Sequence, residues 1–451
     1  MTNVLVYVRP WNYHQFEDLA NRTWNDAHVE FISEHRGQDS SGFISSFYDN
    51  YRKTSSKEKQ DFEWLTNQQI EDIIVRCRLL RALERQQSLR LIESALLAIE
   101  GVFSRFNPDY VFSVTVDSYI IHILSIVSEN RGVRFIGIVP TFLNGYFRVS
   151  TLGEKSTNRK VPGSELESVY NKLIETQYKP AWLAASEKSI NKKANRSWAR
   201  NLIKPLWFRF FSWLRRDPLN AHYLTTRIVS RRYWSILPKK YKGLFDLRQF
   251  ESQPSVKERV KIFLPLQMSP EATVDYWSED TSWVNYENKV LNVVDTARDD
   301  VFFLVKEHPN VLGFRTPKFY SELSARENVV TIAPSISSNE VLEVSDAILV
   351  CTGTVGFEGL LRGKPIISDS NPFYAPKSVF LPVCGLLDEE FSFTQKPAES
   401  DRSFLVEYLV SGFLKGTFLN DGSWRRDNET HLEYNQQIAK SLSEYLRINE
   451  H

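Results

Sequence analysis

The chain has 451 residues and a formal net charge of +1, with 42% hydrophobic and 25% charged residues. This length allows two domains with sizeable cores. The near-neutral charge gives no global attraction to nucleic acid, so no nucleic-acid partner is expected. The three cysteines are too few and too scattered for a disulfide framework or a zinc site, which indicates a reducing compartment.

The first residues, MTNVLVYVRPW, carry no basic leader, and their apolar run is too short for a signal peptide. No window approaches the roughly 20 uninterrupted apolar residues of a transmembrane helix. We therefore expect a cytoplasmic protein, and peripheral binding to the inner face of the inner membrane stays open.

The N-terminal part has the pattern of an α/β domain. Residues 33–60 are polar and predict a loop or a mobile helix, and residues 61–106 predict one long helix with an apolar face. Asp117 lies at the carboxyl end of a predicted strand. The predicted strands of this part are Asn3–Val8, 29–32, 110–114 and 133–139.

A basic and aromatic segment follows. Between Lys192 and Lys242 there are fourteen Lys or Arg and one acidic residue, Asp217, with seven Trp or Phe interleaved. Such a segment fits the headgroup region of an anionic membrane. It equally fits a helical linker whose aromatic side chains fill a groove between domains and whose charges are solvated. Both interpretations stay open.

The C-terminal part contains a second set of strands. Each is apolar on nearly every residue, which is typical of a parallel sheet buried on both faces, and helical patterns separate them. Two such βαβ sets about 200 residues apart predict an α/β chain with two Rossmann-like parallel-sheet domains. The predicted strands of the second set are 260–264, 301–305, 329–332, 347–350 and 365–367.

Polar residues gather where these strands end, which is the edge at which open α/β sheets bind ligands. Hydroxyls beside free backbone N–H groups at a helix start would form a seat for phosphate, and a glycine lets the backbone approach a ligand. A glutamate one turn into the helix could reach a ribose hydroxyl. The candidate nucleotide-binding residues are Gln267, Lys306, His308, Ser337, Ser338, Thr352, Gly353, Thr354 and Glu358.

Each candidate also has an ordinary structural explanation. Ser337 and Ser338 are good helix caps whatever the function, and Glu358 is favoured in a first helical turn by the helix dipole. Lys306 is equally explained as an exposed lysine at a strand end, and a single histidine such as His308 is more often structural than functional.

These motifs resemble a known family. Lys306-x-His308-Pro309, then Ser337-Ser338, then SDAILVCTGTVGFEGLLRGKPII are similar to the donor domain of bacterial capsule polysaccharide biosynthesis glycosyltransferases, and Pro265-Leu266-Gln267 is similar to a segment of the same family. The resemblance covers roughly residues 255–375. The family includes β-Kdo transferases, which have a GT-B fold with two domains facing a cleft and use CMP-Kdo. The His-Pro and Ser-Ser elements are also similar to those of polysialyltransferases and related CMP-sialic acid enzymes.

The resemblance implies that His308 contacts the phosphate or the sugar carboxylate of the donor. Glycosyl transfer also needs a carboxylate as base or nucleophile near the anomeric carbon, and Glu271 and Asp117 are the candidates. The relatives carry an aspartate near the position of Glu271, so this chain departs from their pattern there. No Asp, Glu or His cluster has metal-ligand spacing, so we expect neither a metal nor a cofactor. Lys or Arg charge and helix termini would assist departure of the phosphate.

The expected domains are 1–180 for the acceptor, 181–250 as the basic aromatic linker, 251–425 for the nucleotide-sugar donor, and 426–451 as a helix crossing back to the first domain. We expect a glycosyltransferase that moves an acidic sugar, Kdo before others, from a CMP-linked donor to a polysaccharide or lipid-linked glycan. Three alternatives stay open: a UDP- or GDP-sugar transferase, a non-catalytic capsule assembly protein of the same fold, and a sugar-nucleotide epimerase.

Overall fold

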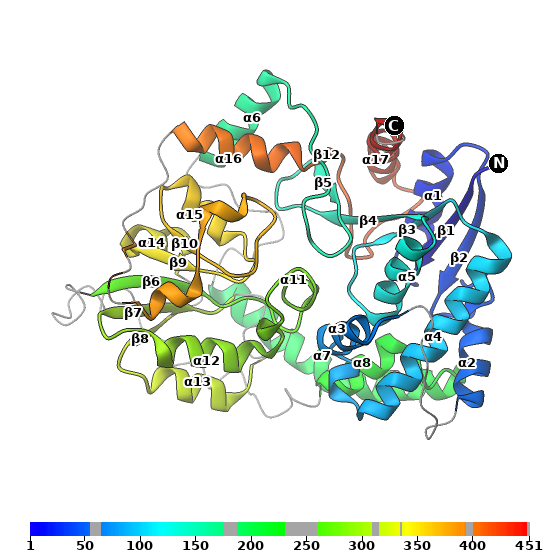
Figure 1. Cartoon of the computed structure of the whole chain (residues 1–451), viewed down its shortest axis with the longest axis horizontal. Helices are drawn as coiled ribbons and strands as arrows, with labels where there is room; N and C mark the ends of the chain where they lie inside the picture. Colours follow the sequence, from blue (N-terminus) through cyan, green and yellow to red (C-terminus); the bar gives the residue numbers. More distant parts are fainter. Residues whose placement is uncertain are drawn as a thin grey trace. The chain divides into compact units, whose positions relative to one another are not determined.

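The computed structural model describes residues 1–54, 65–174, 187–230, 259–308, 315–333, 336–388, 390, 392–393 and 400–448 (Figure 1). Contacts between residues divide the chain into two compact domains. The first contains Met1–Lys160, Leu219–His222 and Val410–His451, and the second contains Val161–Pro218 and Tyr223–Leu409. Part of the basic segment, including Trp234, and Pro309 of the His-Pro motif lie outside the described residues.

The first domain is built around a six-stranded sheet of order β12-β5-β4-β3-β1-β2. The pairs among β1 to β4 are parallel, and β5 and β12 are antiparallel additions at one edge. Its parallel part therefore has the flavodoxin-like order 2-1-3-4, in which β1 and β3 flank the point where the chain reverses direction across the sheet. The strands are β1 (Asn3–Val8), β2 (His28–Ser33), β3 (Tyr110–Val114), β4 (Arg134–Pro140), β5 (Tyr146–Val149) and β12 (Leu414–Lys415).

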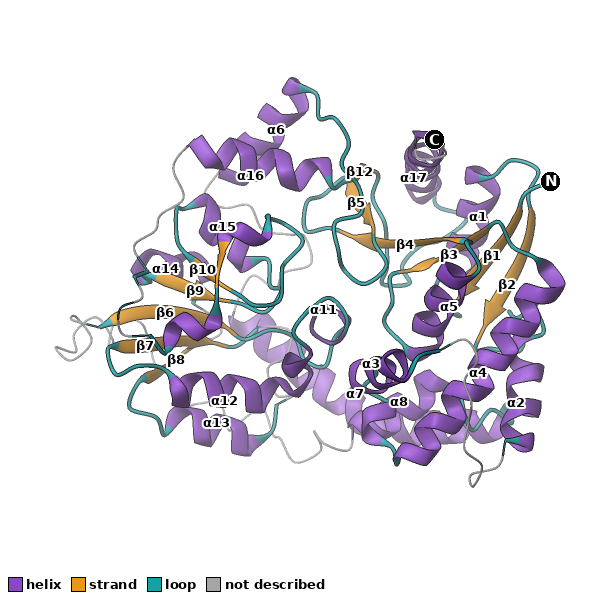
Figure 2. Cartoon of the chain, viewed as in Figure 1, coloured by secondary structure: helices purple, strands orange, loops and turns teal. Residues whose placement is uncertain are grey.

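Helices cover this sheet on both faces (Figure 2). The last helix of the chain packs on the first, and the Asn435 side chain, fully buried, donates to the Gln15 carbonyl at 3.2 Å and to Asp18 Oδ2 at 2.9 Å. The helices are α1 (Tyr13–Thr23), α2 (Phe43–Lys53), α3 (Asn67–Arg76), the 3-10 turn η1 (Leu80–Ala82), α4 (Arg85–Phe106), α5 (Tyr119–Asn130) and α17 (Glu429–Ile448).

Two stretches of this domain differ from the sequence-based expectation. Residues 33–60 contain a packed helix, α2, whose Phe43 and Phe47 are buried against the domain. The helix expected over 61–106 is interrupted between α3 and α4, because Leu79 and Leu80 turn into the core and both are fully buried. No Gly or Pro marks that interruption in the sequence, so the periodic pattern runs through it.

The second domain has a six-stranded sheet in which every pair is parallel, of order β11-β10-β9-β6-β7-β8. Numbered within the domain, this is the order 3-2-1-4-5-6 of the dinucleotide-binding fold, read from its β8 edge. Strand β7, which lies between β6 and the edge strand β8, is buried along its whole length, as its continuous apolar sequence predicts. The strands are β6 (Val260–Pro265), β7 (Val301–Lys306), β8 (Val329–Ile332), β9 (Ala347–Leu349), β10 (Ile366–Ile367) and β11 (Phe380–Leu381).

The helices of the second domain lie on both faces of this sheet, α12 and α13 on one and α14 and α15 on the other (Figure 2). Helix α15 sits close to the strands because a Cβ atom on Gly359 would lie 2.0 Å from Ile348 Cδ1. The helical elements are α6 (Gly163–Ile174), α7 (Glu187–Leu214), α8 (Ala221–Ser230), α11 (Ala272–Asp275), η4 (Thr281–Asn285), α12 (Tyr286–Thr296), α13 (Pro317–Ser324), α14 (Ser338–Val344), α15 (Val355–Leu361), η5 (Lys377–Val379), η6 (Val383–Leu386) and α16 (Ser400–Ser411).

Two Rossmann-like domains in one chain are the composition of the GT-B fold, and the predicted fold class is confirmed. The cleft between them stays a prediction. Among the helices that the structure describes, none is long and apolar enough to cross a bilayer.

Candidate functional site

The loops after β6 and β9 meet at the point where the strand order of the second sheet reverses. Gln267 follows β6, and its Oε1 accepts a hydrogen bond from the Thr352 backbone N–H at 3.2 Å. A Cβ atom on Gly353 would lie 2.4 Å from Gln267 Nε2. The close approach that this glycine permits is therefore to the Gln267 amide. Three of the predicted nucleotide-binding residues come together here, at the position where doubly wound sheets bind nucleotides.

The two threonines of the β9–α15 loop have different surroundings. Thr352 is buried, and its hydroxyl donates to the Thr273 carbonyl at 2.7 Å. Thr354 is half-buried at the start of α15, and its side chain makes no capping hydrogen bond. The Gly353 carbonyl between them accepts from the Tyr374 hydroxyl at 3.1 Å. The loop is thus held at both sides of Gly353.

Lys306 and Glu358 form a charged pair of neighbours beside this loop. Lys306 ends β7 and is 6% exposed, so the reading as an ordinary exposed lysine does not hold. Burial lowers the pKa of Lys306 to about 8, although the carboxylates of Glu307 and Glu358 act in the opposite direction. Burial also raises the pKa of Glu358, against the influence of Arg362 and Lys306. Each side chain is close enough to the other to affect its proton affinity, so β7 and α15 present a cation and an acid together.

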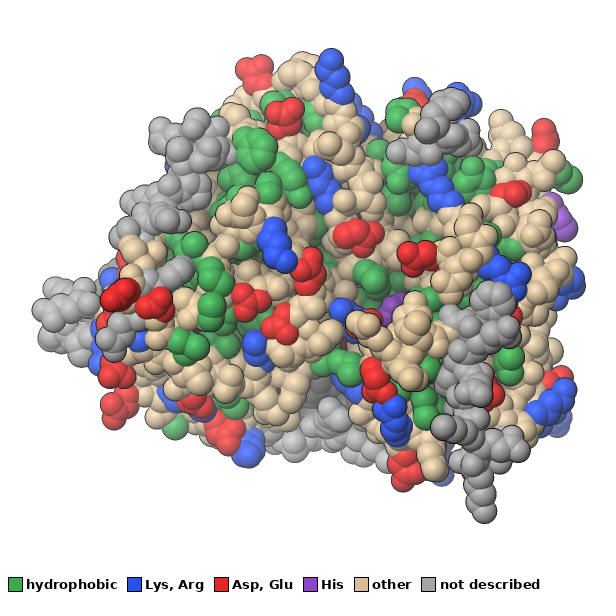
Figure 3. All heavy atoms as spheres, viewed as in Figure 1, with side chains coloured by type: hydrophobic (Ala, Val, Ile, Leu, Met, Phe, Trp, Pro, Cys, Tyr) green, Lys and Arg blue, Asp and Glu red, His purple; other side chains and the backbone are tan. Residues whose placement is uncertain are grey.

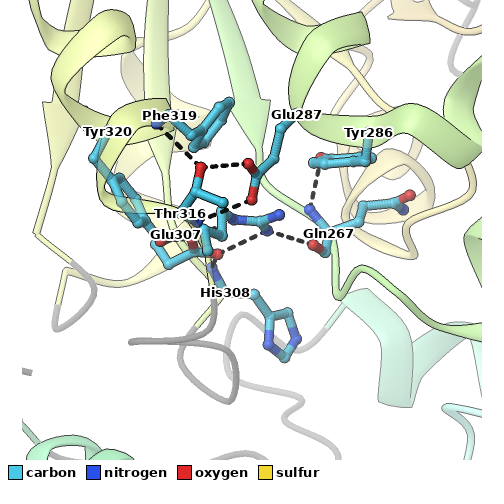
Figure 4. A network of polar contacts seen from close by, with 9 residues as sticks. Gln267, Tyr286, Glu287, Glu307, His308, Thr316, Phe319 and Tyr320 are labelled. Carbon is cyan, nitrogen blue, oxygen red and sulfur yellow. Dashed lines mark hydrogen bonds and ion pairs between the residues drawn. The ribbon is translucent and has the colours of Figure 1, made fainter. Parts of the chain in front are cut away.

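Directly after β7, Glu307 forms a buried ion pair with Arg315, within the network of polar contacts drawn in Figure 4. Arg315 Nη2 donates to Glu307 Oε1 at 3.0 Å, and the two side chains are 1% and 2% exposed. The same guanidinium donates to the Gln267 carbonyl, and the Tyr320 hydroxyl donates to Glu307. Burial by itself would lower the pKa of Arg315, but the adjacent Glu307 carboxylate raises it overall. The pair therefore links the β6 and β7 loops.

Arg315 was not among the sequence-based candidates. It stands eight residues after Glu307 and just before α13, where Thr316 caps the helix by accepting from the Phe319 N–H at 3.2 Å. No repeating pattern in the sequence links Arg315 to the residues at the strand ends. Its position directly before a helix cap was the one feature of the sequence that could have drawn attention to it.

His308 lies directly after this buried pair. Its backbone N–H donates to Glu307 Oε1 at 2.6 Å. The imidazole is half-buried and extends away from the Arg315–Glu307 network (Figure 4). The network thus fixes the His308 backbone, and the contact of its ring with a ligand stays a prediction.

Ser337 performs the structural role of a helix cap. Its hydroxyl accepts from the Asn339 N–H at 3.1 Å, and the Glu340 side chain accepts from the Ser337 N–H at 3.0 Å, which together form a capping box. Beyond Ser338, the Asn339 side chain accepts from Arg362 at 2.9 Å, at the C-terminal end of α15. The Ser337 hydroxyl retains its proton for donation, so a contact with phosphate stays a prediction.

The two candidate catalytic carboxylates have different partners. Glu271 precedes α11 and accepts from the Thr273 hydroxyl at 2.9 Å. In the first domain, Asp117 Oδ2 accepts from Arg9 Nη1 at 2.7 Å, in a two-point ion pair. Arg9 follows β1 and Asp117 follows β3, so this pair spans the reversal point of the first sheet. Arg9 was not a sequence-based candidate, although its place at a strand end was visible.

Among the described residues, no group of three or more His, Cys, Asp or Glu side chains is placed to hold a metal ion. The second domain has the strand order of nucleotide-binding sheets. At its strand ends the Gln267 amide contacts the Thr352–Gly353 loop, and the buried Lys306 lies near Glu358.

The fold defines a GT-B protein with two Rossmann-like domains. Residues 220–379 match the model of the family described as "Capsule polysaccharide biosynthesis protein". The chain therefore carries a capsule polysaccharide biosynthesis domain, and the family resemblance predicted from the sequence is confirmed.

A curated relative matches a shorter part of the chain than the family model does. The capsule polysaccharide modification protein LipA of Neisseria meningitidis serogroup B is 34% identical over 71 residues, and the match covers 16% of this chain and 10% of LipA. Among solved structures, the Thermosulfurimonas dismutans KpsC beta Kdo 2,7 transferase is 12% identical, covers 98% of this chain and 99% of its own, and gives a TM-score of 0.36. The beta Kdo 2,4 transferase of the same organism is 14% identical over 74% of this chain and 87% of its own, with a TM-score of 0.34.

Proposed function

We propose that the chain is a metal-independent GT-B glycosyltransferase that moves an acidic sugar, Kdo, from a CMP-linked donor to a surface polysaccharide or glycolipid. The observation that carries this proposal is the contact of Gln267 with the Thr352–Gly353 loop at the reversal point between β6 and β9. Doubly wound sheets bind nucleotides at this position. Both loops belong to motifs that resemble the capsule polysaccharide biosynthesis family, which includes β-Kdo transferases that use CMP-Kdo, and this resemblance supports cytidine over other bases.

The buried lysine suits the leaving group. Departure of CMP leaves a phosphate whose negative charge grows as the glycosidic bond breaks. A cation held in place at a water-poor site stabilises such a charge more strongly than a solvated cation does. Lys306 would supply this charge, and His308 would contact the phosphate or the sugar carboxylate. Glu358 would accept a hydrogen bond from a ribose hydroxyl.

Of the two carboxylates, Glu271 suits the role of general base better. Asp117 is held at two points by the Arg9 guanidinium, so both of its carboxylate oxygens are engaged in an ion pair. Glu271 accepts a hydrogen bond from the neutral Thr273 hydroxyl and lies in the stretch after β6 that also carries Gln267. We therefore assign proton removal from the acceptor hydroxyl to Glu271 and a role in holding the acceptor to the Arg9–Asp117 pair.

The test is release of CMP by the purified chain. With CMP-Kdo and an acceptor, we expect CMP to be released, and Glu271→Gln, His308→Ala and Glu358→Gln to reduce the rate. Glu327→Gln is the matched control, because Glu327 is exposed and precedes β8 at the opposite edge of the sheet. The proposal is contradicted if the Glu327→Gln control also loses CMP release. It is equally contradicted if the wild-type chain releases no CMP from either CMP-Kdo or CMP-sialic acid.

Nucleotide binding separates the alternatives. A ligand that binds only the folded state raises the melting temperature, so a panel of CMP, UDP and GDP identifies the base, and we expect a shift with CMP. A shift with UDP or GDP instead assigns a different donor. Binding of CMP without turnover favours an assembly protein, and a converted sugar nucleotide without acceptor favours an epimerase.

A further inference from the structure

The second half of helix α7 carries a row of exposed apolar side chains. Six of the twelve large hydrophobic side chains exposed in the described part of the chain lie on this one helix. Their spacing of three and four residues places them on one face. They are Ile203 (61% exposed), Leu206 (66%), Trp207 (57%), Phe210 (52%), Trp213 (74%) and Leu214 (56%).

The opposite side of the helix is packed, in part on α8. Ser212 and Pro205 are buried, and the Phe208 ring stacks on Tyr223 with centroids 5.1 Å apart. The exposed row therefore does not result from a helix that lacks packing. Single exposed apolar residues are common on soluble proteins, but a continuous row containing two tryptophans marks an interaction surface.

The charges around this row have one sign. Residues 188–216 contain nine Lys or Arg and no Asp or Glu. Among these, Lys192, Arg196, Arg200, Arg209, Arg215 and Arg216 are exposed. On the face of the molecule shown in Figure 3, by contrast, acidic and basic side chains are interspersed over the described surface.

We propose that this face of α7, defined by Ile203, Leu206, Trp207, Phe210, Trp213 and Leu214, docks the protein on an anionic lipid bilayer. Tryptophan rings favour the boundary between headgroups and acyl chains, and arginine side chains extend from the apolar face to the phosphates. A second copy of the helix fits worse, because seams between helices are flanked by opposite charges. Here arginine would meet arginine. The inference does not depend on the proposed activity.

The test uses the full-length chain and vesicles of phosphatidylcholine with or without phosphatidylglycerol. We expect co-sedimentation with the phosphatidylglycerol vesicles alone, weakened by salt. The double variant Trp207→Gln/Trp213→Gln should weaken this binding by at least about tenfold, because the loss of two interfacial aromatic anchors removes most of the inserted surface. Arg200→Gln/Arg209→Gln should weaken it to a smaller extent.

The matched control is Leu97→Gln/Leu387→Gln, which removes two exposed apolar side chains from other elements and should leave binding unchanged. Melting curves by circular dichroism verify that each variant is folded. The proposal is overturned if the wild-type chain does not bind, if it binds phosphatidylcholine vesicles equally well, or if the tryptophan variant binds as the wild type does. Self-association in sedimentation velocity that the tryptophan variant abolishes would assign the face to a second copy instead.

Discussion

Each of the two sheets has an arginine–carboxylate pair at the end of its strands, and the two pairs differ in exposure. In the second domain, Arg315 and Glu307 are 1% and 2% exposed and share further contacts with Tyr320 and the Gln267 carbonyl. In the first domain, Arg9 and Asp117 are 16% and 26% exposed and span the reversal point itself. A fully buried pair is costly to disrupt, whereas a partly exposed pair can exchange partners with a ligand. We infer that the Arg315–Glu307 pair supports the candidate site structurally and that the Arg9–Asp117 pair is available to bind a ligand.

The largest expected effect comes from breaking the buried pair. Glu307→Ala leaves Arg315 as an uncompensated buried charge, so we expect a loss of about 3–5 kcal/mol in the free energy of unfolding. Urea unfolding of variant and wild type measures it. Glu71→Ala is the control, because Glu71 pairs with Arg85 on the surface at 49% and 61% exposure and should lose about 1 kcal/mol or less. Equal losses in the two variants would contradict the structural role of Arg315–Glu307.

The next effect comes from Gly353→Ala. The added Cβ would meet Gln267 Nε2 at 2.4 Å, so the amide must move and lose its contact with Thr352. We expect affinity for CMP to fall by about 100-fold, the scale of a misplaced binding group, with little change in the unfolding midpoint. Calorimetric titration measures the affinity. Gly101→Ala is the control, because a Cβ on Gly101 meets no atom within 4 Å. If CMP affinity is unchanged in the Gly353→Ala variant, the β9–α15 loop does not belong to the nucleotide site.

The exposed pair predicts a smaller effect on stability but a selective one on function. We expect Asp117→Asn to lower the free energy of unfolding by about 1 kcal/mol and to leave CMP affinity unchanged. The Michaelis constant for the acceptor should rise, because Arg9 loses the partner that orients it. Steady-state kinetics with varied acceptor shows this. A change in donor affinity instead would place the pair at the donor.

The smallest expected effect is a pH dependence of CMP binding, which comes from Lys306 at the end of β7 in the second domain. Its pKa is lowered to about 8, so its charge is present below that pH and is lost above it. Affinity for CMP should therefore fall above pH 8 by at most about tenfold per unit. Lys306→Met should bind weakly at every pH without this fall. A wild-type affinity that stays flat from pH 7 to about 9.5 would exclude Lys306 from phosphate binding.

The buried strands of the second domain could be predicted to within one residue because both faces are apolar. The run expected at 329–332 is β8, and the run at 301–305 is β7 with Lys306 added. The meeting of Gln267 with Thr352 also followed, since the carboxyl ends of parallel strands share one edge.

What could not be predicted depends on contacts between distant residues or on short elements. Strand β12 pairs with β5 more than 260 residues earlier, and each has at most four residues, too few for a pattern. The Arg315–Glu307 pair joins a loop to a strand end without any period. A mobile helix was one of the two expectations for residues 33–60, but the polar neighbours obscured the apolar spacing of Phe43, Ile44, Phe47 and Tyr48 through which α2 is packed.

The first domain is assembled from both ends of the chain, since β12 extends its sheet and α17 covers α1. The ribosome makes Val410–His451 after every residue of the second domain. The second domain can therefore complete its sheet before these residues are available, while the first still exposes the edge of β5 and the apolar side of α1 until they have left the ribosome.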